Sequence, residues 1–283
     1  MIDHWRLPER TLTFGPIPLL MGIVNVTPDS FSDGGRFIDP LDAVAQGVKL
    51  AEDGAAILDI GGESTRPGAK AVSIEEELQR VIPVIEGLRV QTDVAISIDT
   101  SKSEVAKAAF ASGAEILNDV TGLTGDPLMM RVALDSGAAV CAMHMRGDPR
   151  TMQDRPAYTD AFQEVYDYLA QRRDALEDLG IERDRIALDP GIGFGKTLDH
   201  NLALLRNADR FLELGCPILF GHSRKSYIGQ ILDDDSIERD RTPGTIGTAL
   251  ALASKGVSIL RVHDVRAIHD ALTLFEASGG MDS

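Results

Sequence analysis

Acceptor side chains recur directly after short apolar segments of this sequence. Three of them share this position: Asp99, Asn118 and Asp189. Carboxylates accept hydrogen bonds, and an amide both accepts and donates them. Two carboxylates and an amide that face one pocket would suit a flat heterocycle rich in N–H groups. Lys225, at a similar position, could donate to a ring carbonyl or nitrogen.

A second set of side chains at the ends of apolar segments is suited to phosphate. It comprises Arg66, Arg261 and His263, and arginine forks match phosphate oxygens. Asn25, beside a polar loop, could assist a Mg²⁺ ion, since Mg²⁺ takes few protein ligands together with substrate phosphates. In a chain with a net charge of −16, a cationic cluster at one place indicates an anionic small-molecule ligand.

The stretch 189–196 carries three glycines between a carboxylate and a lysine. It is not a P-loop, because Pro190 occupies the position of the first glycine of that motif. The alternating glycines also differ from the dinucleotide-binding spacing. Taken alone, the stretch is more typical of a tight turn than of a site, because glycine supplies positive φ where a chain must turn.

Composition limits the partners of the chain. A pI near 4.7 argues against a general nucleic-acid or membrane-surface partner, which would need a basic face. The first ten residues are polar and lack the apolar segment of a signal peptide. Cys141 and Cys216 have no metal or redox spacing, so we interpret them as buried, reduced thiols of a cytoplasmic protein.

Eight short, mostly apolar segments alternate with helical patterns. The predicted strands are residues 19–24, 56–60, 94–98, 115–117, 138–143, 186–188, 217–220 and 258–260. The predicted helices are residues 40–53, 74–88, 102–112, 126–136, 159–179, 201–214, 242–254 and 265–277, with one more that begins near Ser226. Such alternation predicts parallel strands with right-handed crossovers.

Eight such units favour a closed α/β barrel, the single (β/α)₈ TIM barrel, over an open doubly wound sheet. We expect one domain over residues 1–283, with residues 1–18 as a short N-terminal arm. Within it, we interpret residues 11–18 as an entry segment that could form one arm of a hairpin. In such barrels the site lies at the carboxyl ends of the strands.

Each polar residue singled out also has a purely structural explanation. Asn25 and Asn118 could be turn residues, and Asp99 and Asp189 could cap helices. Lys225 and Arg261 could be charges on the rim of the barrel. One such residue alone decides nothing, but their common place at one end of one barrel favours a binding site.

Seven blocks of the sequence, in order, resemble dihydropteroate synthase. They are residues 21–35, 59–68, 97–100, 118–120, 189–196, 223–225 and 261–265. The resemblance implies a (β/α)₈ barrel, a homodimer and a transferase of folate biosynthesis. This family condenses 6-hydroxymethyl-7,8-dihydropterin diphosphate with p-aminobenzoate, which gives 7,8-dihydropteroate and diphosphate.

The resemblance also implies roles for individual residues. It assigns the pterin to Asp99, Asn118, Asp189, Lys225 and Thr65. It assigns the diphosphate to Asn25, Arg66, Arg261 and His263, with Mg²⁺ at Asn25. It assigns the aminobenzoate to Phe31, Thr65, Pro67, Phe194, Lys225 and Ser226. The implied catalytic residues are Asp99, Lys225, Arg261 and His263.

These roles lead to a hypothesis about the mechanism. An aniline nitrogen is a modest nucleophile, so we expect departure of diphosphate to precede attack. Asp99 would stabilise the pterin cation that is left behind, and the loops at 27–37 and 64–71 would exclude water from it.

Three alternatives remain open. A pterin-binding methyltransferase barrel would share the acceptors but has no diphosphate to hold. A non-catalytic pterin-binding paralogue would keep the site without turnover. A sugar-phosphate isomerase barrel would need a poised base at a strand end, for which His144 is the candidate, although a structural histidine is favoured there.

Overall fold

The computed structural model describes residues 2–27, 39–64, 71–147, 151–233 and 240–281 of the chain. Its main sheet contains eight parallel strands in the order β8-β7-β6-β5-β4-β3-β10-β9. A parallel bridge between Leu188 and Ile218 joins β8 to β9. The sheet is therefore closed into a barrel, and the predicted (β/α)₈ architecture is confirmed.

The strands are short and almost wholly buried. They are β3 (Leu19–Asn25), β4 (Ile57–Gly61), β5 (Ala95–Asp99), β6 (Ile116–Asp119), β7 (Ala139–Met143), β8 (Ile186–Asp189), β9 (Leu219–Phe220) and β10 (Ile259–Val262). Burial on both faces explains why the strands read as continuous apolar runs. Only β9 is clearly shorter than predicted, because Pro217 has no N–H to donate to a neighbouring strand.

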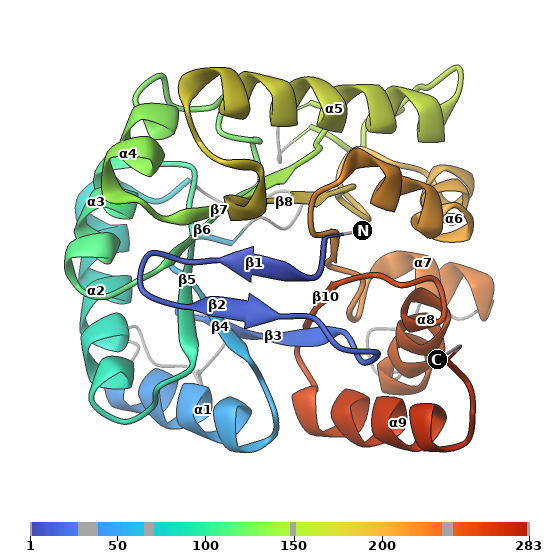
Figure 1. Ribbon diagram of the computed structural model, residues 1–283, viewed down its shortest axis with the longest axis horizontal. Coiled ribbons are helices and arrows are strands. Elements are labelled where there is room, and N and C mark those ends of the chain that lie inside the picture. Colours follow the sequence, from blue (N-terminus) through green and yellow to red (C-terminus); the bar gives the residue numbers. More distant parts are fainter. Residues whose placement is uncertain (1, 28–38, 65–70, 148–150, 234–239, 282–283) are drawn as a thin grey trace.

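A ring of helices surrounds the barrel (Figure 1). The α-helices are α1 (Pro40–Glu52), α2 (Ile74–Arg89), α3 (Ser103–Ala111), α4 (Met129–Ser136), α5 (Ala161–Leu179), α6 (Leu198–Arg206), α7 (Ser226–Ile231), α8 (Thr242–Ala253) and α9 (Val265–Ala277). Two 3₁₀-helices are η1 (Arg183–Arg185) and η2 (Ala208–Leu214). The helical patterns predicted from the sequence are confirmed, apart from one.

The predicted helix over residues 201–214 is divided in two. It begins earlier, because Thr197 and His200 form a reciprocal capping box at the start of α6. The α-helix then ends at Asn207, whose side-chain Nδ2 donates to the carbonyl of Ala203 at 2.8 Å. The rest of the segment is the 3₁₀-helix η2.

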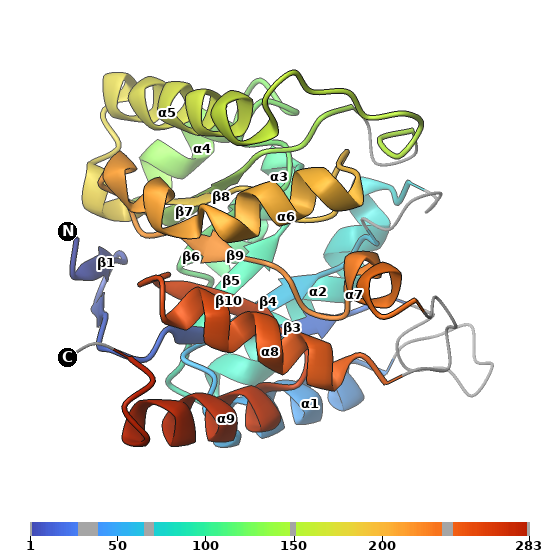
Figure 2. The ribbon, with the colours of Figure 1, turned by 90° about the vertical axis from the view of Figure 1, so that its right-hand side faces the viewer.

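The N-terminal arm is a two-stranded antiparallel hairpin. Strand β1 (His4–Arg6) pairs antiparallel with β2 (Thr11–Thr13), so the segment predicted as a hairpin arm does contain one strand of a hairpin. The other strand of the hairpin carries Trp5, which was not singled out in the sequence. Its side chain is fully buried, and its indole Nε1 donates to the carbonyl of Arg185 at 3.0 Å. Figure 2 shows β1 at one end of the barrel and α7 at the other.

Trp5 fills the interior of the barrel at the amino end of the strands. It packs there with inward-facing strand residues, among them Met21, Ile57, Ile116 and Ile259. A second and larger core lies between the sheet and the helices and includes Leu58 and Ile60. Because successive side chains point to opposite faces of a strand, the inward-facing positions two residues after Ile57, Ile116 and Ile259 are the polar residues Asp59, Asn118 and Arg261.

Candidate active site

The register of the sheet brings the predicted acceptors together. Asn25 of β3 is paired with Gly61 of β4, Gly61 with Asp99 of β5, and Asp99 with Asn118 of β6. The three polar side chains therefore lie within four consecutive strands of the sheet, β3 to β6, at the carboxyl end of the barrel. Asn25 and Asp99 are the last residues of their strands.

Asp59 connects the acceptors to a cation inside the barrel. It lies in the middle of β4 and is fully buried. Its Oδ2 accepts a hydrogen bond from Asn118 Nδ2 at 3.0 Å and another from Arg261 Nε at 2.5 Å. Arg261 also donates through Nη2 to Asp99 Oδ2 at 2.7 Å. One carboxylate thus fixes both the amide and the guanidinium.

Sequence reasoning missed Asp59 as a site residue. Only strand ends were considered, whereas Asp59 lies two residues inside its strand. A charged residue within an otherwise apolar strand was the signal that could have revealed it, because a buried charge must be paired.

Two of the predicted acceptors have strongly raised pKa values. Burial raises the pKa of Asp99 to about 7, against the opposing effect of the Arg261 guanidinium. Burial also raises the pKa of Asp189 to about 6, although the N–H of Gly191 donates to Asp189 Oδ1 at 2.7 Å and opposes this rise. Both groups are carboxylates above about pH 7, when they can accept from a bound ring.

Lys225 and Phe194 form one wall of the site. The ammonium nitrogen of Lys225 lies 4.2 Å from the centroid of the Phe194 ring, within cation–π distance. Phe194 packs in a small apolar cluster with Val120, Met143 and Met152. An apolar wall beside hydrogen-bonding groups is the usual composition of a site for a flat aromatic ligand.

The remaining predicted residues are placed as follows. His263 follows β10, and its Nδ1 lies 3.0 Å from the hydroxyl of Ser223. Ser226 is the first residue of α7, as predicted, and Lys225 is its N-cap residue. Phe31, Thr65, Arg66 and Pro67 lie outside the described residues, as do most of the loops 27–37 and 64–71.

His144 is not available as a catalytic base. It is buried at the end of β7, and its Nδ1 lies 3.0 Å from the Nζ of Lys196. Burial lowers the pKa of His144 to about 3, and the nearby Lys196 ammonium acts in the same direction. The structural role favoured from the sequence is therefore supported, and the isomerase alternative loses its candidate base.

The residue predicted to hold Mg²⁺, Asn25, lies at this end of the barrel. Asn25 contributes one amide oxygen at the partly exposed end of β3. Within the described ranges, no cluster of three or more histidine, cysteine, aspartate or glutamate side chains could hold a metal by itself. A single amide ligand fits Mg²⁺, which keeps most of its coordination for water and phosphate oxygens.

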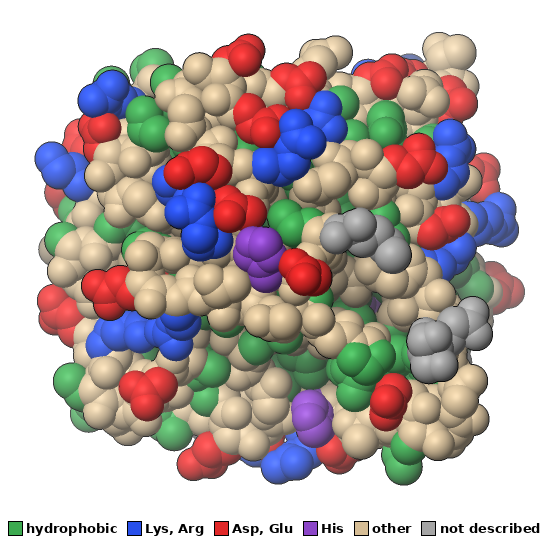
Figure 3. Space-filling model, viewed as in Figure 1, with side chains coloured by type: hydrophobic (Ala, Val, Ile, Leu, Met, Phe, Trp, Pro, Cys, Tyr) green, Lys and Arg blue, Asp and Glu red, His purple; other side chains and the backbone are tan. Residues whose placement is uncertain are grey.

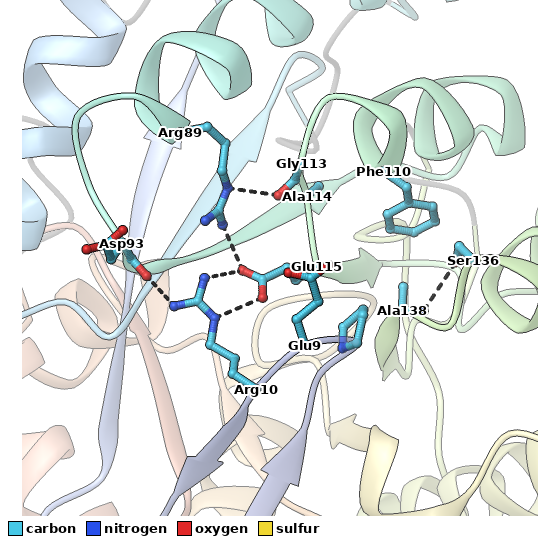
Figure 4. A pocket seen from close by; sticks show the side chains of 11 residues that line it. Glu9, Arg10, Arg89, Asp93, Phe110, Gly113, Ala114, Glu115, Ser136 and Ala138 are labelled. Atoms are coloured by element: carbon cyan, nitrogen blue, oxygen red, sulfur yellow. Dashed lines mark hydrogen bonds and ion pairs between the residues drawn. The ribbon is translucent and has the colours of Figure 1, made fainter.

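A cavity of about 640 Å³ lies at the opposite, amino end of the strands. Figure 4 shows Arg10 and Arg89 directed at Glu115 there. The two guanidinium groups donate to this carboxylate at 2.6 to 2.8 Å. These bonds attach the N-terminal hairpin to the barrel, so this cavity is separate from the polar residues at the carboxyl end.

The surface, the helices and the cysteines add three observations. Acidic and basic side chains are interspersed on the face shown in Figure 3. Across the part of the chain that is described, no helix is long and apolar enough to cross a membrane. Cys141 and Cys216 are both buried free thiols.

Comparison with known proteins agrees with this geometry. The model of the pterin binding enzyme family matches residues 21–263. The dihydropteroate synthase of Escherichia coli strain K12 is 47% identical over 261 residues, which cover 92% of each chain. The structure of Xanthomonas albilineans dihydropteroate synthase with 4-aminobenzoic acid superposes with a TM-score of 0.92 at 46% identity and covers 100% of both chains.

A second structure of the Xanthomonas albilineans enzyme contains 7,8-dihydropteroate. It has a TM-score of 0.87 and 43% identity, and it covers 99% of this chain and 100% of that one. Full-length similarity at this identity, together with the acceptors and the arginine at the carboxyl end of the barrel, leads to one conclusion: this chain belongs to the pterin-binding enzyme family, and within it to the dihydropteroate synthases.

Proposed function

We propose that the carboxyl end of the barrel is where this transferase joins its two substrates. The chain condenses 6-hydroxymethyl-7,8-dihydropterin diphosphate with p-aminobenzoate to give 7,8-dihydropteroate and diphosphate. One observation supports this location above all: Asp99, Asn118 and Asp189 all lie at one end of the barrel, and Arg261 pairs with Asp99 there.

The pterin ring would bind deepest. Asn118 and Asp189 are only 5% and 4% exposed, so their bonds to a ring would form with little competition from water. The amide and carboxylate oxygens accept from ring N–H groups, and Lys225 donates to a ring acceptor. The aminobenzoate would lie further out, between Phe194 and the start of α7.

The diphosphate would lie at the rim, near cations. Arg261, whose side chain is 19% exposed, is fixed by Asp59 and Asp99 and needs no reorganisation to meet a developing negative charge. His263 and Arg66 would add donors, and Asn25 would be the protein ligand of Mg²⁺. The bound ion would neutralise charge on the diphosphate.

The mechanism that we propose is dissociative. Departure of diphosphate leaves positive charge on the pterin methylene group, and the Asp99 carboxylate is placed to stabilise it. The aminobenzoate nitrogen then attacks and loses its proton to solvent or to a nearby base. This order makes the negative charge of Asp99 essential in the step that limits the rate.

Asp99→Asn tests this role. We expect kcat to fall by roughly a hundredfold, because removing a charged hydrogen-bonding group from an active site costs about 3 kcal/mol. Pterin affinity, measured by calorimetry, should change much less than kcat. Unchanged turnover with intact substrate binding would exclude a cation-stabilising role for Asp99.

Two further properties stay predictions. A cytoplasmic location is supported by the two unpaired, buried cysteines, since disulfides are rare in that compartment. The homodimer expected from the family resemblance can be checked by light scattering.

A methyltransferase remains the alternative of another reaction class. The paired, partly exposed guanidinium of Arg261 and the neighbouring His263 favour a substrate with phosphate over one without it. Tight binding of the pterin diphosphate, compared with the same pterin alcohol, distinguishes the two.

A further inference from the structure

Lys196 is a buried lysine at the end of the glycine loop, and the proposed chemistry does not use it. Lys196 is only 3% exposed. Its Nζ lies 2.9 Å from the carbonyl oxygen of Gly191, 3.0 Å from that of Phe194 and 3.0 Å from His144 Nδ1. An ammonium has three donors and no acceptor, so these three acceptors satisfy it.

The ammonium of Lys196 is buried among groups of the protein itself. Burial lowers the pKa of Lys196 to about 7, which the Asp189 carboxylate opposes. Placing a charge where it is so poorly solvated is costly unless it is fully hydrogen-bonded. The three bonds of Lys196 therefore hold the glycine loop against His144, directly after β7.

The glycine loop is pressed against the backbone that follows β7. A Cβ atom at Gly191 would lie 2.0 Å from the carbonyl oxygen of His144, and one at Gly195 would lie 2.2 Å from that of Arg146. Both glycines have positive φ, of 70° and 62°. Only glycine permits this approach, and it brings the loop carbonyls within reach of Lys196.

Other side chains hold the outer part of the same loop. Asn201 Oδ1 accepts from the N–H of Gly193 at 2.8 Å, and Gln153 Nε2 donates to the Gly193 carbonyl at 2.5 Å. The Tyr158 hydroxyl donates to the Gly195 carbonyl at 3.0 Å. Lys196 reaches the inner carbonyls of Gly191 and Phe194, and the Phe194 N–H also donates to the Gly191 carbonyl at 3.2 Å.

Phe194 links this scaffold to the site. Its carbonyl is bound by Lys196, while its ring lies 4.2 Å from the Nζ of Lys225. Gly193 also contacts Lys225, since a Cβ there would lie 3.2 Å from Lys225 Cδ. A shift of the loop would move both the aromatic wall and the lysine beside it.

We propose that Lys196 is a positioning residue for the aminobenzoate half of the site. It fixes the backbone of Phe194, and Phe194 in turn presents its ring against Lys225. This inference rests on the proposed function, because it needs Phe194 and Lys225 to line the aminobenzoate pocket.

Lys196→Met tests the proposal, since methionine nearly matches the length of the side chain and removes every donor. Loss of a buried hydrogen-bonded charge at the loop should raise the KM for p-aminobenzoate by about tenfold. The dissociation constant of the pterin diphosphate, measured by calorimetry, should change by less than about threefold. Lys196→Gln, which keeps an N–H donor, should lie between the wild type and Lys196→Met.

Two controls separate positioning from simple destabilisation. Leu176→Ala removes a fully buried side chain of α5 away from the loop, and it should lower Tm without changing the KM for p-aminobenzoate. In a double-mutant cycle, Phe194→Ala combined with Lys196→Met should raise this KM no more than Phe194→Ala alone, because Lys196 acts through Phe194.

The outcomes are distinct. If Lys196→Met lowers Tm as Leu176→Ala does and leaves the KM for p-aminobenzoate unchanged, Lys196 is only structural. If the two substitutions in the cycle act independently, Lys196 does not act through Phe194. If Lys196→Met does not fold, Lys196→Gln carries the same comparison. Condensation by the wild type is measured before the variants are compared. Its absence would refute the proposed function and not the role of Lys196.

Discussion

Asp189 provides the sharpest link between the site and stability, and Asp189→Asn should stabilise the ligand-free protein at pH 8. Asp189 is 4% exposed, and burial raises its pKa from 3.8 in the unfolded chain to about 6 in the folded one. Between these pH values the folded chain holds a proton that the unfolded chain has released. The free energy of unfolding therefore falls as pH rises through this window and stays lower above it.

The size of the effect follows from this difference of about two pH units. It corresponds to about 3 kcal/mol at pH 8, as an upper value, because each unit is worth about 1.4 kcal/mol. Asparagine removes the charge and keeps an oxygen that can accept the 2.7 Å bond from the Gly191 N–H. The gain should shrink as pH falls through about 6 towards 4, where the wild-type carboxyl group is itself protonated.

Urea denaturation of both proteins at pH 8 and pH 4.5, without ligands, measures the gain. Calorimetry should show that Asp189→Asn binds the pterin diphosphate roughly tenfold to hundredfold more weakly, because a charged acceptor is lost. Asp199→Asn, at an exposed carboxylate near the same loop, is the matched control and should change stability by less than about 0.5 kcal/mol. A variant no more stable than the wild type at pH 8, or equally stabilised at both pH values, would refute the reasoning.

Two further predictions concern the same end of the barrel. Asp59→Asn should lower kcat/KM by roughly tenfold to hundredfold with the fold retained by circular dichroism. The reason is that a neutral amide no longer offsets the charge of the Arg261 guanidinium, which pairs with Asp59 Oδ2 beside Asn118. Unchanged kcat/KM would show that Asp59 does not position them. Removal of Mg²⁺ by a chelator should raise the KM for the pterin diphosphate and be reversed by added Mg²⁺, because Asn25 alone binds the ion weakly without phosphate; chelator-insensitive kinetics would remove the metal from the proposal.

Much of the fold could be predicted from the sequence because burial imposes a simple pattern on parallel strands. Each strand lies between the barrel interior and the helices, so it reads as a short apolar run that ends where polar residues meet solvent or ligand. The acceptors Asp99 and Asp189 were found for this reason, as each closes its strand.

What could not be predicted depends on contacts between distant elements. Asp59 gains its role from Asn118 of β6 and Arg261 of β10, and the apolar run of β4 gave no indication of either partner. The role of Lys196 could not be predicted, because the backbone carbonyls that it binds converge only after the glycines of the loop adopt positive φ. The first strand of the hairpin was not predicted, because Trp5 is buried through contacts with distant strands and donates to the carbonyl of Arg185.

Diphosphate release by the purified protein tests the central claim most directly. The pterin diphosphate and Mg²⁺ are supplied with and without p-aminobenzoate, and both diphosphate and dihydropteroate are measured. We predict that p-aminobenzoate yields the two products in equal amounts, and that slow diphosphate release persists without it, since departure precedes attack. No release in either case, with pterin binding still detected by calorimetry, would contradict the assignment of condensation to this site.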